Sequence, residues 1–153
     1  MIVVSDTSPV TALLTIGQAE ILQKLFGQVI VPQSVREELS RSHRDLPSWL
    51  HVEAIKDLAK KERLRKSVDA GEAEAIVLAK ELGADQLLID EKKGRRIAIS
   101  EGIPVIGLLG VVLLAKRSNL LPSARAVLDR LDREAGVYLS ETLRETALRA
   151  VGE

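Results

Sequence analysis

Residues 71–90 read GEAEAIVLAKELGADQLLID, and this stretch decides the fold class. Small and apolar residues recur through residues 71–82 at helical spacing, and Gly83 follows where helices commonly end. Residues 86–89 form a short, mainly apolar run, which predicts a buried strand, and Asp90 comes directly after it. A helix that leads into a short apolar strand predicts the repeating unit of a parallel α/β sheet.

The same alternation extends to both sides of this stretch. Strands are predicted at residues 2–4, 29–31, 51–55 (a short irregular or edge strand) and 105–106. Helices are predicted at residues 9–14 (Ser8 as N-cap and Pro9 as the first helical residue), 19–26, 32–41, 57–66, 92–101, 107–116, 122–133 and 141–151. This pattern predicts an α/β fold whose parallel sheet is covered on both faces.

The composition limits the classes of protein to consider. A chain of 153 residues predicts a single domain over residues 1–153. Because it has no Cys, disulfides, zinc–thiolate sites, iron–sulfur clusters and Cys nucleophiles are excluded. The 22 Lys and Arg residues balance 22 Asp and Glu residues, which argues against a broadly cationic nucleic-acid binder. Aromatic residues at 2% argue against a stacking platform for single strands.

No segment predicts export or membrane insertion. The first ten residues, MIVVSDTSPV, lack the basic and long apolar regions of a signal peptide. The longest apolar run, residues 106–115, is too short to span a bilayer. We therefore expect a cytoplasmic protein with no membrane partner.

Two aspartates directly follow predicted strands. Asp6 comes shortly after the strand at residues 2–4, and Asp90 follows the strand at residues 86–89. In an open parallel sheet, ligands bind outside the carboxyl ends of the strands. If these two strands are neighbours, the two carboxylates share one crevice. The alternative is that each aspartate only caps the helix that follows it.

Two glutamates are predicted to lie near apolar helix faces. Glu38 follows Val35 by three residues and precedes Leu39, so it projects close to the inward stripe of its helix. At about 100° per residue, Glu72 lies at the rim of the apolar face of its helix. Glu74 points to the solvent side on the same wheel, and we expect it to be an ordinary surface residue. The alternative for Glu72 is a favourable interaction with the helix dipole alone.

Four carboxylates that face one crevice repel each other unless they are protonated or neutralised by a cation. His43 and His51 lie in or near a polar loop at residues 40–47 without the spacing of a metal motif, and we expect both at the surface. Oxygen ligands without Cys or a His pair favour a hard ion. The residues therefore predict Mg²⁺ or Mn²⁺ bound by Asp6, Glu38, Glu72 and Asp90.

Four segments carry a family resemblance. They are VVSDTSP (residues 3–9), VPQSVREEL (31–39), GEAEAIVLA (71–79) and LLIDEKKGRRIA (87–98). In this order they resemble the PIN-domain family, whose members are mostly metal-dependent ribonucleases, many of them VapC-like toxins of toxin–antitoxin pairs. The resemblance covers about residues 1–116 and implies a three-layer α/β/α sandwich around a parallel sheet of about five strands. Residues 120–153 would be a helical extension, with a short strand or turn at residues 137–139.

The resemblance also implies roles for single residues. Asp6, Glu38, Glu72 and Asp90 match the family's catalytic acids, which bind one or two Mg²⁺ or Mn²⁺ ions. Thr7 and Ser8 match hydroxyl positions near the metal, and Glu91 is the candidate for a further acid. Ile89 departs from the pattern, since relatives often carry Thr or Ser there. The resemblance further implies a homodimer and, for a toxin, an antitoxin protein as partner.

Basic residues next to the acids are candidates for contact with an RNA backbone. Lys93, Arg95 and Arg96 closely follow Asp90, while Arg41 and Arg44 lie in a second basic segment near Glu38. The alternative for each is a solvated helix face. We expect the charged residues 60–66 to be solvated only.

The sequence thus predicts metal-assisted hydrolysis of RNA phosphodiester bonds. The alternative is a catalytically weak or inactive PIN-like module that binds RNA or a protein, which the departure at Ile89 keeps open. A phosphoaspartate protein is a third reading of the strand that precedes Asp6 and Thr7. It fits less well, because a dehalogenase-type phosphatase requires a second aspartate where Ser8 stands.

Overall fold

A five-stranded, all-parallel sheet forms the centre of the computed structural model, which describes residues 1–153. Its strands are β1 (Val3–Ser5), β2 (Val29–Pro32), β3 (Leu50–Glu53), β4 (Gln86–Leu88) and β5 (Val105–Ile106). They lie in the order β3-β2-β1-β4-β5, and every neighbouring pair is parallel. The predicted α/β fold with about five parallel strands is confirmed.

Strand β1 lies in the middle of the sheet because both of its faces are apolar. Val3 and Val4 are fully buried, and successive side chains point to opposite faces of a strand. Val3 therefore packs into one core cluster and Val4 into the other. The register pairs Val4 with Leu87 and Ser5 with Leu88, so β1 and β4 end at the same edge of the sheet.

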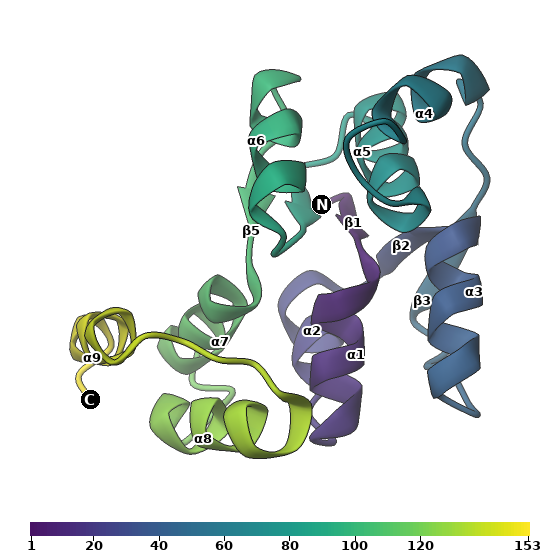
Figure 1. Ribbon diagram of the computed structural model, residues 1–153. Helices are drawn as coiled ribbons and strands as arrows, with labels where there is room; N and C mark the ends of the chain where they lie inside the picture. The colour runs from purple at the N-terminus through teal and green to yellow at the C-terminus, as the bar shows by residue number, and fades with distance from the viewer.

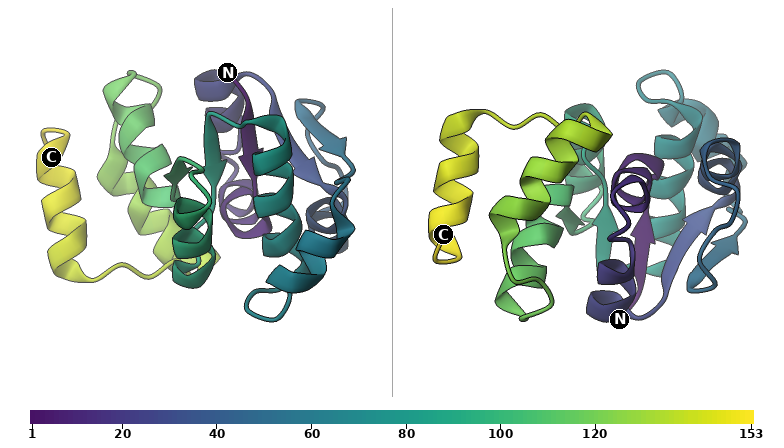
Figure 2. Two further views of the ribbon diagram at one scale, coloured as in Figure 1. Left: turned by 90° about the horizontal axis from the view of Figure 1, so that it is seen from above. Right: turned by 90° about the horizontal axis from the view of Figure 1, so that it is seen from below.

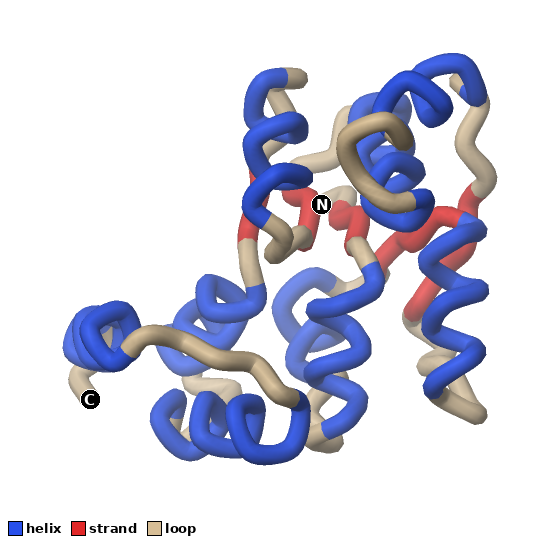
Figure 3. Tube along the Cα trace, viewed as in Figure 1, coloured by secondary structure: helices blue, strands red, loops and turns tan.

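The helices form a layer on each side of the sheet. Figure 1 shows α4 (Leu58–Leu64), α5 (Ala70–Leu82) and α6 (Lys92–Ser100) on one side. On the other side lie α1 (Thr7–Thr15), α2 (Glu20–Phe26), α7 (Leu108–Arg117) and α8 (Ala124–Ala135). Helix α3 (Gln33–Ser42) flanks the sheet beside β2, and the strands lie between the two helix groups in Figure 3. The three-layer α/β/α architecture is confirmed.

The last helix, α9 (Glu141–Ala150), packs at one end of the molecule, next to α7 and α8 (Figures 1 and 2). Leu148 buries its whole side chain against the larger core cluster. The Glu153 carboxylate accepts hydrogen bonds from the backbone N–H groups of Ala124 and Arg125, at 2.6 and 3.2 Å. It thereby satisfies free N–H groups at the start of α8 and fastens the tail to the domain. None of the helices combines the length and apolar character that crossing a bilayer requires.

Two local predictions are wrong. Helix α1 begins at Thr7 with Asp6 in the N-cap position, rather than at Pro9 after a Ser8 cap. The segment at residues 137–139 forms neither strand nor turn. Gly136 ends α8 in the left-handed conformation, Ser140 caps α9, and no strand lies alongside the residues between them.

Candidate active site

A polar cleft lies at the carboxyl ends of the central strands. Its volume is about 560 Å³, and none of its ten lining residues is hydrophobic. The residues that line it are Asp6, Thr7, Ser8, Thr11, Glu38, Arg41, Ser42, Asp69, Glu72 and Glu91. We call this cavity the acid cleft. It brings together three of the four predicted acids, both predicted hydroxyl residues and Glu91.

Asp6 occupies the centre of this arrangement. Its backbone N–H donates to the carbonyl oxygen of Leu88 at 2.9 Å, which ties the residue to β4. Its carboxylate makes no capping hydrogen bond to α1, so the capping alternative does not account for it. Burial raises the pKa of Asp6 to about 7. A backbone hydrogen bond from Thr7 acts in the opposite direction, and the nearby carboxylates of Asp69 and Glu38 raise the pKa further. Burial therefore disfavours the charged form of this carboxyl group unless a cation neutralises it.

Gly71 lets the first turn of α5 approach the other acids closely. A Cβ atom at this position would lie 2.7 Å from Oε1 of Glu38 and 3.5 Å from Oδ1 of Asp6. Gly94 plays a similar part on α6, because its Cβ would lie 3.0 Å from Oε2 of Glu72. The two glycines therefore make room for the carboxylates of Glu38 on α3, Glu72 on α5 and Asp6, which directly follows β1.

Glu72 is buried at the rim of the apolar face of α5, as predicted. Its Oε2 atom has no hydrogen-bond partner, and neither has the buried Oγ1 atom of Thr7. Burial raises the pKa of Glu72 to about 8, with further contributions from Asp69 and Asp6. Buried polar atoms in native proteins are normally satisfied, so these two oxygens are available to a ligand in the cleft.

Asp69 is a fifth acid that the sequence analysis missed. It is the N-cap residue of α5, and its Oδ1 atom accepts the backbone N–H of Glu72 at 2.8 Å. A signal for it exists in the sequence, because an N-cap residue followed three positions later by Glu is the pattern of a capping box. The helix predicted from Gly71 onward begins too late to use this signal.

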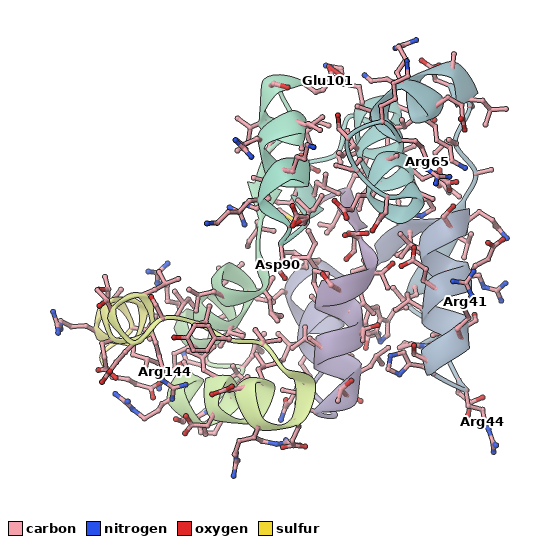
Figure 4. The ribbon with its side chains drawn as sticks, viewed as in Figure 1. Arg41, Arg44, Arg65, Asp90, Glu101 and Arg144 are labelled. Carbon is pink, nitrogen blue, oxygen red and sulfur yellow. The ribbon has the colours of Figure 1, made fainter.

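Asp90 lies beside the acid cleft rather than in it. Strand β4 is the neighbour of β1, which is the condition that a shared crevice requires. The Oδ1 atom of Asp90 nevertheless accepts the backbone N–H of Leu108 at 2.8 Å, at the start of α7. Desolvation raises the pKa of Asp90, although Leu108 and the nearby Arg95 act in the opposite direction. Figure 4 shows Asp90 between α6 and α7. Its charge still reaches Asp6, whose pKa it helps to raise.

The basic residues predicted to contact an RNA backbone do not all lie at the acid cleft. Arg41, in the last turn of α3, lines the acid cleft together with Glu38. Arg44 lines another cavity and lies beyond the end of α3 in Figure 4, far from Asp90. The Nη1 atom of Arg95 donates to the carbonyl oxygen of Ile89 at 3.4 Å, whereas Arg96 is exposed on α6.

Lys93 is likewise exposed on α6, while Glu91 accepts its backbone N–H at 3.0 Å and so caps that helix. His51 is exposed, as expected. His43 is half-buried, and its Nε2 atom lies 3.3 Å from the hydroxyl oxygen of Thr11. Neither histidine lies among the acids of the cleft.

The prediction that Glu74 is a surface residue is wrong. Only 5% of the residue is exposed, and its carboxylate accepts the backbone N–H and the hydroxyl of Ser34, at 3.0 and 2.5 Å. Lys61 pairs with it at 2.5 Å, so residues 60–66 are not merely solvated. Burial acts to raise the pKa of Glu74, but Lys61 and Ser34 outweigh it and lower the pKa. Helices α3 and α4 cover a second flank of α5 that one helical wheel cannot show.

Comparison with known proteins gives one match. A family model described as a PIN domain matches residues 2–153. The chain belongs to the PIN-domain family. The match includes residues 120–153, so the helical tail lies within the matched region. Nothing matches the chain among curated proteins or solved structures. Membership of the PIN-domain family indicates a nuclease-type hydrolase in general.

PIN domains typically bind divalent metals, and the acid cleft offers suitable donors. Asp6, Glu38, Asp69 and Glu72 provide only oxygen atoms, which Mg²⁺ and Mn²⁺ prefer. No three acidic or histidine side chains already converge as a complete ligand set. The unpaired Oε2 of Glu72 and the raised pKa values of Glu72 and Asp6 fit a cation that draws the carboxylates together.

Proposed function

We propose that this PIN-domain protein is a metal-dependent endoribonuclease whose acid cleft holds one or two Mg²⁺ or Mn²⁺ ions. The observation that carries the proposal is the gathering of Asp6, Glu38, Asp69 and Glu72 in one cleft without hydrophobic lining. Asp6 and Glu72 are buried, and buried carboxylates are costly unless a cation neutralises them. RNA is the substrate we favour, because the four sequence segments resemble a family composed mostly of ribonucleases.

The residues of the acid cleft would have different roles in catalysis. Asp6, Glu38 and Glu72 would hold the ion, with Asp69 as a further carboxylate and Asp90 beside the cleft. A bound divalent ion supplies an activated water and neutralises charge on the scissile phosphate. The Thr7 hydroxyl has its hydrogen-bonding capacity free for a ligand. Arg41 lies on the same cleft, where its guanidinium group can bind a phosphate oxygen.

Cleavage of labelled single-stranded RNA tests this proposal directly. We expect cleavage with Mn²⁺ or Mg²⁺, none with EDTA, and none by Asp6→Asn. Glu62→Gln is a matched control, because Glu62 is an exposed acid on α4. Calorimetry should show Mn²⁺ binding that requires Asp6. Absence of both cleavage and Asp6-dependent binding would refute the metal site.

A second candidate function is RNA binding without cleavage. The observation that favours it is the position of Asp90, whose Oδ1 atom already accepts a hydrogen bond from Leu108. The acid is then less free to bind a metal than its position after β4 suggests. If this second function is correct, the protein would bind RNA in EDTA and would cleave no RNA in Mg²⁺ or Mn²⁺.

We also propose, from the resemblance to VapC-like proteins, that the chain is the toxin of a toxin–antitoxin pair and forms a homodimer. An antitoxin protein would neutralise the acid cleft with a cationic side chain. Induced expression in bacteria should then arrest growth, and Asp6→Asn should relieve the arrest. Normal growth alongside RNA cleavage in vitro would remove the toxin role and leave the nuclease.

A further inference from the structure

A second cavity opens next to the acid cleft. It has a volume of about 470 Å³ and lies between α7, α8 and the start of the tail that leads into α9. Eight of its eleven lining residues are hydrophobic, among them Leu109, Leu128, Leu139 and Leu143. We call it the apolar groove. Its volume is in the range of small-ligand sites, which are concave and mostly apolar with a few polar groups.

The apolar groove adjoins the acid cleft. Ser8 lines both cavities. The other polar residues of the groove, Asp90 and Lys92, follow β4 at the same edge of the sheet. A ligand held in the groove therefore has its polar end next to the acids, and Lys92 offers that end a positive charge.

Tyr138 lines the groove from the segment between α8 and α9. It is the only tyrosine of the chain, and 79% of the residue is exposed. Its neighbours Val137 and Leu139 are half-buried and pack against the larger core cluster. The backbone on both sides is thus anchored while the aromatic ring remains available to a ligand.

We infer that the apolar groove is a base-binding subsite, in which one unpaired base of the nucleic acid lies against Tyr138 while its phosphate reaches the acid cleft. The inference rests on the proposed function and deepens it. A nucleotide combines a flat base with apolar faces and an anionic phosphate, as the groove combines leucines with Lys92 at its polar side. Bases stack on aromatic side chains regardless of their identity.

Because Tyr138 is the one aromatic residue that lines the groove, the subsite can stack a single base. This agrees with the low aromatic content, which argues against a platform for several stacked bases. It also restricts the substrate to single-stranded segments, because a base within a duplex is stacked and paired. The apolar face of a protein partner would leave Asp90 and Lys92 without a binding partner. A second copy of this chain is therefore a less suitable occupant of the groove, and the experiment below tests for it.

The single tyrosine makes a direct measurement possible. Incorporation of 3-fluorotyrosine gives one ¹⁹F resonance, which reports on residue 138 alone. The labelled Asp6→Asn chain in EDTA would be titrated with a short single-stranded oligouridylate. An abasic ribose–phosphate chain of equal length would be the matched ligand control. We expect a saturable shift with oligouridylate and little or none with the abasic chain.

Equal shifts with both ligands, or none with either, would overturn the inference. A resonance that moves with protein concentration alone would also overturn it, because a second copy of the chain would then occupy the groove. A base-dependent shift, combined with a parent chain that cleaves no RNA in Mn²⁺ or Mg²⁺, would support the subsite while refuting the nuclease. The two proposals therefore fail separately.

Variants supply the second readout. Tyr138→Ala should weaken oligouridylate binding about 5- to 150-fold, the range expected for one stacked base, and leave binding of the abasic chain unchanged. Tyr138→Phe retains the ring and should bind like the parent chain. Leu58→Ala, at a 63% exposed position on α4, is the control for loss of an exposed apolar side chain. An equal loss for both ligands in Tyr138→Ala would contradict the subsite.

Discussion

The Oδ1 atom of Asp69 accepts the backbone N–H of Glu72 at 2.8 Å, so the residue that caps α5 also belongs to the acid cleft. Glu72 in turn presents an oxygen atom that no protein group satisfies. The partial positive charge at the N-terminus of a helix favours both carboxylates there. Under the proposed function, the first turn of α5 would therefore serve both helix stability and ion binding.

Two substitutions at Asp69 separate these roles. Asp69→Asn retains a good N-cap but removes the charge, whereas Asp69→Ala removes both. We expect Asp69→Ala to lower the free energy of unfolding by about 0.5–2 kcal/mol and Asp69→Asn to change it little. Both should weaken Mn²⁺ binding. Urea denaturation and calorimetry measure the two effects, and wild-type Mn²⁺ affinity in Asp69→Asn would exclude Asp69 from the ion site.

The stability of the metal-free protein should fall as pH rises from about 4 to 8. Asp6 and Glu72 have folded-state pKa values of about 7 and about 8, above their ordinary values of 3.8 and 4.5. In this interval the folded state binds more protons than the unfolded state, so stability decreases with pH. Each group contributes a slope of at most about 1.4 kcal/mol per pH unit.

Urea denaturation in EDTA across this pH range measures the slope. Asp6→Asn should reduce it, because one of the groups with a raised pKa is gone. Adding Mn²⁺ at pH 8 should restore stability to the parent chain by binding the folded state. A stability that rises with pH in EDTA would show that the acids are not mutually destabilised.

The short apolar runs before Asp6 and Asp90 predict that both residues lie at the edge of the sheet where its parallel strands end. That the two strands are neighbours is known only from the structure. The runs do not predict the orientation of the Asp90 carboxylate. That orientation depends on the N-terminus of α7, eighteen residues later, where the Leu108 N–H lies within reach. Contacts of this kind arise only when the tertiary structure forms.

The misplacement of Glu74 has a similar origin. A helical wheel identifies one apolar face, and Glu74 lies away from it. Helix α5 is buried on more than that face, because α3 brings Ser34 and α4 brings Lys61 against its flank. The sequence of a charged helix such as α4 has no apolar periodicity that would show which surface it packs against. The burial of Glu74 beneath it therefore cannot be predicted from the sequence of either helix.

Gly71→Ala should impair ion binding without unfolding the protein. Alanine favours helix over glycine by about 1 kcal/mol, yet its Cβ would lie 2.7 Å from Oε1 of Glu38. The flexible Glu38 side chain must then move away from the cleft. We expect a free energy of unfolding within about 1 kcal/mol of wild type and at least a tenfold loss of Mn²⁺ affinity, similar to that of Glu38→Gln. Unchanged Mn²⁺ affinity would show that the ion does not use Glu38.

Glu74→Gln should destabilise the domain without touching the acid cleft. The Glu74 carboxylate joins Ser34 of α3 and Lys61 of α4 to α5, and its loss leaves buried donors poorly satisfied. We expect a decrease of about 1–3 kcal/mol in the free energy of unfolding at pH 7, with Mn²⁺ affinity unchanged.

Because the folded-state pKa of Glu74 lies below its ordinary value of 4.5, this contribution is present above pH 4.5 and is lost as pH falls through the folded-state pKa. Urea denaturation at pH 7 and pH 3 measures it, with Glu62→Gln as the exposed control on α4. Equal stabilities of Glu74→Gln and Glu62→Gln at pH 7 would mean that the three-helix connection contributes nothing.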